Sequence, residues 1–580
     1  MSISFYNKHI LSVLTATAII ALSLTTSCQD DSVLPDPLTP LTPNAAETDI
    51  SPSDSTLADL FEGLTLATPL KPYGNRNPIM TQAFGADPYA ITYNDRVYIY
   101  MSADTPRLEG GVIQKNDYGN INRLRLLSSS DLANWTEHPP IRVAGTGGIA
   151  RWATQSWAPA VAYKNIGGQT RFFLYFSNNI RGIGVLQSDS PTGPFTDPLG
   201  RALINNQTQG VAGVTWLFDP DVLVDDDGKA YIYFGGGIPG EDAPDFAAQL
   251  AALNTNHPMP GTIRVAELGN DMTSIVSGSV RPFPVPFSFE AAAIDKIGGV
   301  YYFSYCTNFE VRRFSARPQQ FPEAAQLVDG GTIAYMTSDS PTEGFTLRNV
   351  ILRNPINMFG GRLGNNHHKM FEFKGGWYMA YHSRLLAVAM GLDDAGRPSS
   401  EDLGGYRITH VDAVTVNTAT RTINRVDGTR TGVPQVGRFN PYDTISAATI
   451  GVMAGISTAE YGTGANARMK VTDIHSGDWV ALHGADFGII GAGKFTCRVT
   501  PPASGFGAIQ IRRGGLTGTP VGYVRVEPGQ AEYSVDLMQT VSGVHDVVFV
   551  FYGTGWDFET WRFVEADESM SVKEVDRVVR

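Results

Sequence analysis

Short hydrophobic runs rich in Tyr, Phe and Ile recur along the middle of the chain, and most of them follow glycine or a charged turn. They begin at Tyr98, Phe173, Tyr231, Tyr302 and Tyr378, at spacings of 75, 58, 71 and 76 residues. Runs of this length and composition are typical of β-strands. A strand that returns in this way predicts a radial array of antiparallel sheets that bury each other's faces. We therefore predict an all-β chain with a five-bladed β-propeller over residues 66–435.

A second β-rich unit follows a stretch with glycine and proline at residues 432–441. Its hydrophobic runs alternate with turns and lie at 480–482, 495–499, 508–511, 522–526 and 547–551. This pattern predicts a β-sandwich of the jelly-roll type over residues 441–565. Residues 566–580 form a tail of mixed charge.

The N-terminus predicts export. Lys8 and His9 precede an apolar run over residues 10–24, which small residues and Cys28 close. The run is too short to span about 30 Å of hydrocarbon, which indicates a signal peptide over residues 1–28. A cysteine after small residues resembles a bacterial lipoprotein cleavage site, where Cys28 would carry the lipid. The alternative is ordinary secretory cleavage nearby.

Residues 29–65 are rich in Pro, Thr and Ser and lack apolar periodicity, so we expect a flexible tether. The expected location is the cell envelope, as an outer-membrane lipoprotein, or outside the cell as a secreted protein. We expect contact with a membrane only through the lipid anchor.

The composition narrows the class of ligand. The formal charge of −13 offers no cationic surface for phosphates, which argues against a nucleic-acid partner. Charged residues make up 17% of the chain and aromatic residues 10%, a balance that suits neutral ligands such as carbohydrate. The three cysteines are too few for a disulfide scaffold and show no metal-binding spacing.

Ionisable residues precede four of the five repeated runs. Asp87, Asp219, Glu290 and His367 each lie 11 or 12 residues before the first aromatic of their run. The second repeat has Trp157-Ala158-Pro159 at that place, without an ionisable group. If equivalent positions occupy the innermost strand of each blade, three carboxylates and a histidine converge on the central channel.

Carboxylates packed into an aromatic channel have their pKa values pushed apart by desolvation and mutual repulsion. One group is then protonated and another ionised near neutral pH, which is what acid and base catalysis on a glycosidic bond requires. The alternative is structural, because Asp-Pro pairs also begin turns.

Several longer motifs carry a resemblance. They are Asn77-Pro78-Ile79, Gly85-Ala86-Asp87-Pro88-Tyr89-Ala90, Trp152-Ala153-Thr154-Gln155-Ser156-Trp157-Ala158-Pro159, Trp216-Leu217-Phe218-Asp219-Pro220, Asp225-Asp226-Asp227-Gly228-Lys229-Ala230, Gly364-Asn365-Asn366-His367-His368 and Gly405-Tyr406-Arg407. Over residues 70–435 the chain resembles glycoside hydrolase family 43, the five-bladed propeller enzymes that act on arabinose- and xylose-containing polysaccharides.

The resemblance implies a role for each carboxylate. Asp87 matches the general base that activates water, and Glu290 matches the general acid that protonates the leaving oxygen. Asp219 matches the third carboxylate, which orients the acid and tunes its pKa. The family inverts the anomeric configuration, which needs a base and an acid about 6.5 to 9.5 Å apart.

The resemblance also implies residues around the substrate. Trp216, Trp157 and Arg407 match substrate-binding positions, although Arg407 could instead contact a catalytic carboxylate. His367 matches a histidine that contacts a structural calcium ion directly or through water. The adjacent His368 leaves open which of the two points inward. No cofactor is required for the chemistry.

The C-terminal unit resembles carbohydrate-binding module family 6. The motifs are Val471-Thr472-Asp473-Ile474, Gly477-Asp478-Trp479, Gly543-Val544-His545-Asp546 and Trp561-Arg562-Phe563. Two departures stand out, because Ser446-Ala447-Ala448 replaces acidic calcium ligands and Gly529-Gln530-Ala531 lacks the stacking Trp. Trp556, Tyr552 and Tyr461 could form another sugar surface, or the module packs on the propeller without binding sugar.

Together these features predict an inverting, exo-acting glycosidase that removes α-L-arabinofuranosyl side groups from arabinoxylan. A β-xylosidase or arabinanase with the same carboxylates is one alternative. The other is a non-catalytic glycan-binding surface lipoprotein, which would have little need of all three carboxylates.

Overall fold

A computed structural model describes residues 56–241, 243–252, 257–327, 330–393 and 404–566. The predicted signal peptide with Cys28, the tether up to residue 55 and the tail from residue 567 lie outside these ranges. Within the described ranges, no helix has the length and apolar character needed to cross a membrane.

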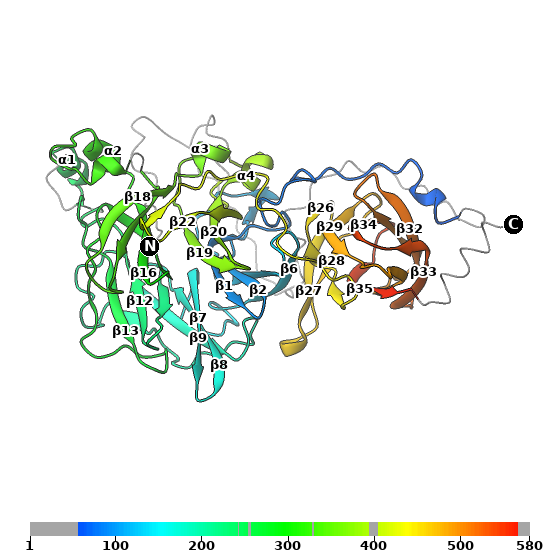
Figure 1. The fold of residues 1–580 in the computed structure, drawn as a ribbon, viewed down its shortest axis with the longest axis horizontal. Coiled ribbons are helices and arrows are strands. Elements are labelled where there is room, and N and C mark those ends of the chain that lie inside the picture. Colours follow the sequence, from blue (N-terminus) through cyan, green and yellow to red (C-terminus); the bar gives the residue numbers. More distant parts are fainter. Residues whose placement is uncertain (1–55, 242, 253–256, 328–329, 394–403, 567–580) are drawn as a thin grey trace, which may run out of the picture. The chain divides into compact units, whose positions relative to one another are not determined.

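Five antiparallel sheets follow one another through the described residues from 86 to 414 (Figure 1). In hydrogen-bonded order the first contains β1 (Ala86–Tyr93), β2 (Arg96–Ser102), β5 (Leu124–Ser129), β6 (Trp135–Ile141) and β25 (Thr449–Ile450). The second contains β10 (Ile204–Asn205), β9 (Gly182–Ser188), β8 (Gln169–Ser177) and β7 (Trp157–Ile166). The third contains β11 (Asp221–Val224), β12 (Ala230–Phe234), β13 (Arg264–Leu268) and β14 (Arg281–Pro282). The fourth contains β15 (Ser288–Ile297), β16 (Val300–Thr307), β17 (Ile333–Ser338) and β18 (Thr346–Leu352). The fifth contains β19 (His368–Phe373), β20 (Gly376–Ser383) and β21 (Ile408–Val414).

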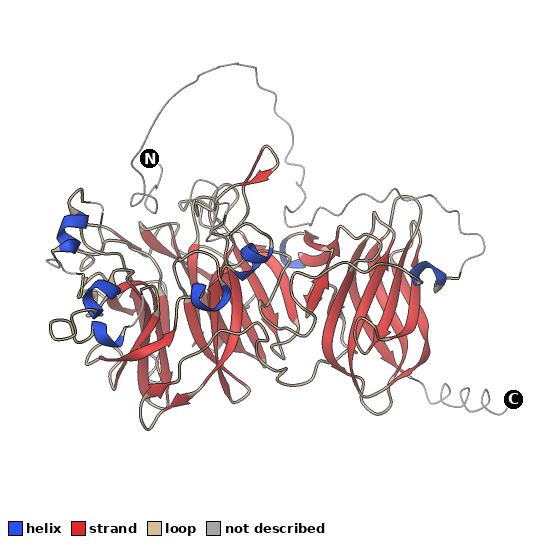
Figure 2. Cartoon of the chain, turned by 90° about the horizontal axis from the view of Figure 1, so that it is seen from above, coloured by secondary structure: helices blue, strands red, loops and turns tan. Residues whose placement is uncertain are grey.

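The connections between these strands hold short helices and two-stranded ribbons (Figure 2). The helices are α1 (Phe246–Ala251), α2 (Val311–Ser315), η2 (Ala324–Gln326), α3 (Ile356–Phe359) and α4 (Leu385–Ala389). The ribbons are β3 (Leu108–Glu109) with β4 (Val112–Ile113), and β22 (Val416–Asn417) with β23 (Thr422–Ile423).

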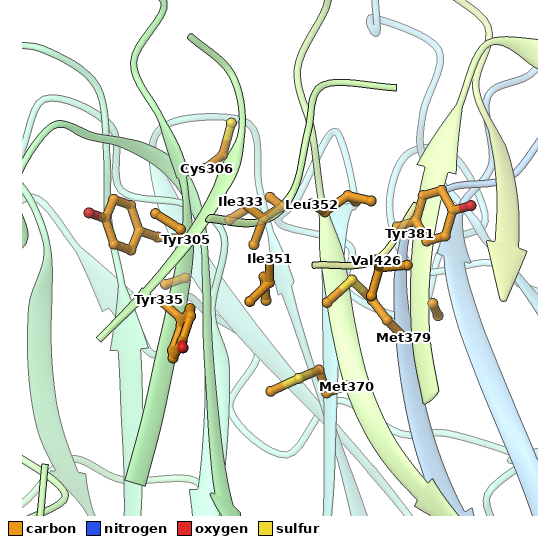
Figure 3. Close-up of a cluster of buried hydrophobic side chains, with 14 of the residues drawn as sticks. Tyr305, Cys306, Ile333, Tyr335, Ile351, Leu352, Met370, Met379, Tyr381 and Val426 are labelled. Atoms are coloured by element: carbon orange, nitrogen blue, oxygen red, sulfur yellow. The ribbon is translucent and has the colours of Figure 1, made fainter. Parts of the chain in front are cut away.

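The repeated aromatic run is the second strand of each sheet, and the strand before it is the first. The first strands contact one another in a cycle: β1 with β7, β7 with β11, β11 with β15, β15 with β19, and β19 with β1. Apolar side chains fill the space between successive sheets. Figure 3 shows one such layer, in which Ile333 and Ile351 lie across from Met370 and Met379.

A buried lysine joins four of the five first strands. Lys369 of β19 donates to Asp221 of β11 at 2.8 Å and to the carbonyl of Ile294 of β15 at 2.7 Å. Its ammonium also lies 3.1 Å from Asp295 of β15. The hydroxyl of Tyr89 of β1 donates to Asp221 at 2.6 Å. These residues form the Lys369 network, which fixes the first strands relative to one another.

The C-terminal part is a β-sandwich with a largely apolar interior. One sheet contains β27 (Ser457–Tyr461), β28 (Arg468–Thr472), β35 (Asp557–Glu565), β30 (Ala492–Thr500) and β33 (Glu532–Val541), with β24 (Ile445–Ser446) paired to β35; a short turn, η4 (Gly464–Asn466), lies between β27 and β28. The other contains β26 (Val452–Ala454), β29 (Trp479–Asp486), β34 (Val544–Tyr552), β31 (Gly507–Arg513) and β32 (Thr519–Val526).

The sandwich is joined to the first of the five sheets by backbone and side-chain hydrogen bonds. The short strand β25, which precedes β26, pairs with β6 and so extends that sheet. The side-chain amide of Asn134 donates to the carbonyl of His483 at 2.8 Å and accepts its N–H at 2.7 Å. Thr458 donates to the buried carboxylate of Glu137 at 2.7 Å. Main-chain pairing of this kind fixes the two parts in one orientation.

The described end of the predicted tether, residues 56–65, packs against the sandwich. A 3-10 turn, η1 (Asp59–Phe61), places Phe61 against the outer face of the five-stranded sandwich sheet. Farther along, the indole N–H of Trp479 donates to the carbonyl of Ala67 at 2.9 Å. The composition in Pro, Thr and Ser does not predict this packing. The apolar contacts come from scattered leucines and Phe61, which show no periodicity in the sequence.

We predict that Phe61→Ala lowers the free energy of unfolding of the sandwich by about 2–4 kcal/mol, because it removes a buried aromatic ring. Denaturant unfolding followed by tryptophan fluorescence measures the change. Glu62→Ala, at the exposed neighbouring position, is the matched control and leaves stability within about 0.5 kcal/mol of wild type. Equal stability of the two variants would show that the segment is not held against the sandwich.

Candidate active site

The first strands of the five sheets share one register. In each sheet the repeated aromatic of the second strand pairs with a residue of the first strand. The position four residues before that partner is occupied in turn by Asp87, Ala158, Asp219, Ala291 and His367. The register therefore aligns two carboxylates and the histidine at one level of the five strands.

Glu290 lies one residue before this shared position, which corrects the equivalent placement that its spacing predicts. Its Cα pairs with Cys306 of β16, as that of Ala86 pairs with Ser102 of β2. The aromatic Tyr231 follows its cross-strand partner Leu223 by eight residues, whereas Tyr302 follows its partner Asp295 by seven. Equal spacings of 12 residues to the aromatic run conceal the difference.

The backbone is left-handed at the shared position in four sheets, although none of the residues is glycine. The φ angles are 48° at Asp87, 39° at Ala158, 46° at Asp219 and 59° at Ala291. Such conformations cost about 1–2 kcal/mol for an ordinary residue and persist where the surroundings hold them. In each case the N–H donates to a side chain of a neighbouring sheet: to His382 Nδ1 at 3.0 Å, Ser102 Oγ at 2.9 Å, Ser177 Oγ at 2.9 Å and Asp219 Oδ2 at 3.0 Å, respectively.

Asp87 is a buried carboxylate held by a buried arginine. Nη1 of Arg407 donates to Asp87 Oδ1 at 2.7 Å. Two ring nitrogens lie near the same oxygen, His382 Nδ1 at 3.3 Å and His367 Nδ1 at 3.9 Å. Burial alone would raise the pKa of Asp87, but the charge of Arg407 together with the contacts of His382 and His367 outweighs burial and holds the pKa well below its usual range. Asp87 is therefore ionised at neutral pH.

Glu290 and Asp219 show the opposite behaviour. Burial raises the pKa of Glu290 well above its usual range, and repulsion from Asp219 and Asp87 adds to the effect. Burial and the charge of Asp87 also raise the pKa of Asp219, while the Ala291 N–H opposes the shift. The Oε1 atom of Glu290 is buried and has no hydrogen-bond partner among the described residues. The site thus combines an ionised carboxylate with a protonated one.

His367, and not His368, faces the carboxylates. Its Nδ1 lies 3.8 Å from Asp219 Oδ2, whereas His368 Nε2 lies 2.6 Å from the hydroxyl of Ser304. Burial lowers the pKa of His367 from 6.5 to about 4, so the imidazole is neutral near pH 7.

The donors around His367 do not fit a calcium site by themselves. Calcium prefers six to eight oxygen ligands. Within the residues that the structure describes, no group of three or more His, Cys, Asp or Glu side chains could hold a metal ion. Calcium at His367 stays a prediction, and no step below depends on it.

The predicted substrate-binding residues occupy different surroundings. Trp216 is half-buried and packs edge-on against Phe218 and Phe289, at centroid distances of 5.4 and 5.1 Å. Phe289 is the neighbour of Glu290 in the chain, so Trp216 packs against the strand that carries that carboxyl. Trp157 is also half-buried, and its indole N–H donates to the carbonyl of Tyr118 at 3.1 Å. Arg407 is only 3% exposed and binds carboxylates.

Three residues of the site are absent from the sequence-based expectation. Asp104 binds Arg407 through both carboxylate oxygens, at 2.9 and 2.8 Å. The ring of Tyr118 lies 4.8 Å from the Arg407 guanidinium carbon. His382 accepts the Asp87 N–H and ends the fifth aromatic run, where the first two runs end in serine. That recurrence of polar residues was a usable signal for His382, whereas Asp104 and Tyr118 lie in irregular segments without one.

Of the three aromatic residues expected to form another sugar surface on the sandwich, Trp556 lies in the interior. Trp556 is 2% exposed and packs on Phe551 in the interior. Tyr552 contacts Phe61 of the N-terminal segment at a centroid distance of 6.2 Å. Trp556 is therefore a core residue, whereas Tyr552 and Tyr461 are half-buried.

Comparisons with known proteins place the chain in a family. The family model described as glycosyl hydrolases family 43 matches residues 75–400, and that of carbohydrate binding module family 6 matches residues 446–565. The chain belongs to glycosyl hydrolase family 43.

Two relatives match over most of the chain. An arabinoxylan arabinofuranohydrolase of Paenibacillus polymyxa is 41% identical over 520 residues, covering 87% of this chain and 76% of that protein. One of Bacillus subtilis is 42% identical over 520 residues, covering 86% and 94%. A crystal structure of a family 43 arabinoxylan arabinofuranohydrolase from Bacillus subtilis, in complex with cellotetraose, has a TM-score of 0.76 and 40% identity; it covers 87% of this chain and 100% of that one.

We predict that Glu290→Gln is more stable than wild type at neutral and alkaline pH. The unfolded glutamate ionises above about pH 4.3, whereas the folded protein keeps the proton. The wild type therefore loses stability relative to the variant as the pH rises past that value. Melting temperatures at about pH 4 and about pH 8 measure this, with the difference confined to the higher pH.

Asp87→Asn is the control of opposite sign. Its folded pKa is depressed, so ionisation of Asp87 stabilises the wild type above the unfolded pKa of about 3.9. We expect the variant to be less stable than wild type near neutral pH, with the deficit shrinking toward low pH. A pH-independent difference in both variants would contradict the charge assignment.

Proposed function

We propose that the protein is an inverting, exo-acting glycoside hydrolase that removes α-L-arabinofuranosyl side groups from arabinoxylan. The observation that carries the proposal is the pairing of an ionised Asp87 with a protonated Glu290 in one buried site. Relatives that match over most of the chain are arabinoxylan arabinofuranohydrolases, which supports the choice of sugar and polymer.

Asp87 is the general base and Glu290 the general acid. Asp87 takes a proton from the attacking water as the water oxygen bonds to the anomeric carbon. Glu290 gives its proton to the glycosidic oxygen as the bond to the xylose unit breaks. The two transfers balance, and attack opposite the leaving group yields β-arabinofuranose. Asp219, which accepts the N–H of the residue after Glu290, orients the acid, while burial and the charge of Asp87 keep the pKa of Glu290 high.

The five sheets act as the blades of a β-propeller, and their first strands line its channel. The cyclic contacts among the first strands support this closure. A residue at the start of each first strand then faces the same end of the channel. Trp216, which packs on Phe289 next to the acid in the chain, offers an indole edge or face to the arabinose ring, and Trp157 begins β7, the first strand between β1 and β11.

Proton NMR of the protein with arabinoxylan tests the substrate and the stereochemistry. We expect β-arabinofuranose as the first anomer released, and no arabino-oligosaccharide from linear arabinan or xylose from xylo-oligosaccharides. Release of xylose, or of arabino-oligosaccharides, would overturn the substrate. The α-anomer as first product would overturn inversion.

Glu290→Gln and Asp87→Asn are the controls in the same assay. Each removes one proton transfer, and we expect kcat to fall about 10²–10⁴-fold. Binding of an arabinoxylan oligosaccharide, measured by calorimetry, stays close to wild type because neither change alters the shape of the site. Near-normal turnover in either variant would remove the assigned role.

We also propose that Cys28 is lipidated after export and that the enzyme works on the cell envelope. A tethered enzyme suits a polymer that cannot enter the cell. Cells that express the protein and are fed a radiolabelled fatty acid should label the wild type and not Cys28→Ser. Labelling of neither protein would leave ordinary secretion as the route, and labelling of both would place the lipid on a residue other than Cys28.

A further inference from the structure

Asp104, Tyr118 and Asp87 surround the guanidinium of Arg407, so substrate cannot reach most of its donors. Its backbone N–H and its Nε both donate to Asp104 Oδ2 at 2.9 Å, and Nη2 donates to Asp104 Oδ1 at 2.8 Å. The ring of Tyr118 covers one face of the guanidinium. Nη1 remains for Asp87. The orientation in which Arg407 reaches Asp87 is therefore set by Asp104.

Asp104 itself cannot act on the substrate. It is fully buried, with 0% of its surface exposed, and among the described residues its carboxylate accepts hydrogen bonds from Arg407 alone. Its charge still matters to the reaction. An arginine balanced by Asp87 alone would form a tight ion pair with the base and hinder it from accepting a proton.

We propose, on the basis of the function proposed above, that Asp104 is a positioning residue that fixes Arg407 against the base and shares its charge. Arg407 is then a partly neutralised donor. It keeps Asp87 ionised and in place without binding it so strongly that the base stops working.

The groups that face this pair define what the charge of Asp104 can affect. The charges of Asp87 and Arg407 shift the pKa values of Asp219, next to the third sheet, and of Glu290 in the fourth sheet. His382 of the fifth sheet and His367, which directly precedes that sheet, lie near Asp87. The ring of Tyr118 faces Arg407. Loss of one negative charge from this set makes every remaining carboxyl ionise more readily. The pKa of Glu290 therefore falls when Asp104 is neutralised.

Two variants separate charge from geometry. Asp104→Asn removes the charge, and we expect both limbs of the pH profile of kcat/KM to move to lower pH, by about one unit for the alkaline limb. Asp104→Glu keeps the charge but displaces Arg407. It should lower kcat while the alkaline limb stays where it is in the wild type. The KM of both variants should stay near wild type because Asp104 does not touch the sugar.

The profiles are measured with an arylated α-L-arabinofuranoside, and circular dichroism establishes that each variant is folded. Identical profiles for the two variants, or a loss of rate without a shift in Asp104→Asn, would overturn the proposal. Asp104→Ser repeats the neutral change if Asp104→Asn does not fold. If neither neutral variant folds while Asp104→Glu does, Asp104 is structural only and the proposal is wrong. A wild type inactive on arabinofuranosides would instead refute the substrate, and the same profiles would be taken on the glycoside it cleaves.

Discussion

The Lys369 network is the contact on which the site depends. Tyr89, Asp221 and Lys369 follow Asp87, Asp219 and His367, respectively, by two residues along the chain. The network therefore lies one step farther along the first strands than these three residues. Removing one member of a buried ion pair leaves an uncompensated charge, which costs about 3–5 kcal/mol. The network therefore holds the strands in register at the level where the carboxylates must meet.

Charge balance is the second constraint, because the site is buried throughout. Arg407 is the cation closest to Asp87, and Asp104 occupies most of its donors. Little positive charge remains for Glu290 and Asp219, so burial keeps the acid protonated. His367 does not change this balance near pH 7, since burial keeps it neutral. Asp87 is thus the base because Arg407 binds it directly, and Glu290 is the acid because burial outweighs the effect of Arg407 there.

The repeats explain how much of this could be predicted from the sequence. The aromatic runs mark the second strands, and the residues before them mark the first strands, because both patterns are local. The one-residue offset of Glu290 could not be seen, since it depends on comparing hairpin lengths in two sheets. Asp104 could not be found either, because its partner lies 303 residues away along the chain. The packing of Phe61 was missed because isolated apolar residues give no periodic signal.

The sandwich is built into the catalytic part more firmly than a separate binding module would be. Its strand β25 extends the first sheet, and Lys71 of the N-terminal segment donates to the carbonyls of Pro78 and Gly451, both at 2.9 Å. Burial lowers the pKa of Lys71 to about 7, so these carbonyl contacts offset only part of the cost of burying the amine. A buried amine is retained at such a cost where it fixes geometry. Trp556 lies in the core and Tyr552 packs against Phe61, so both rings are used within the protein. The pairing of β25 and the contact of Lys71 with Gly451 attach the sandwich to the rest of the chain.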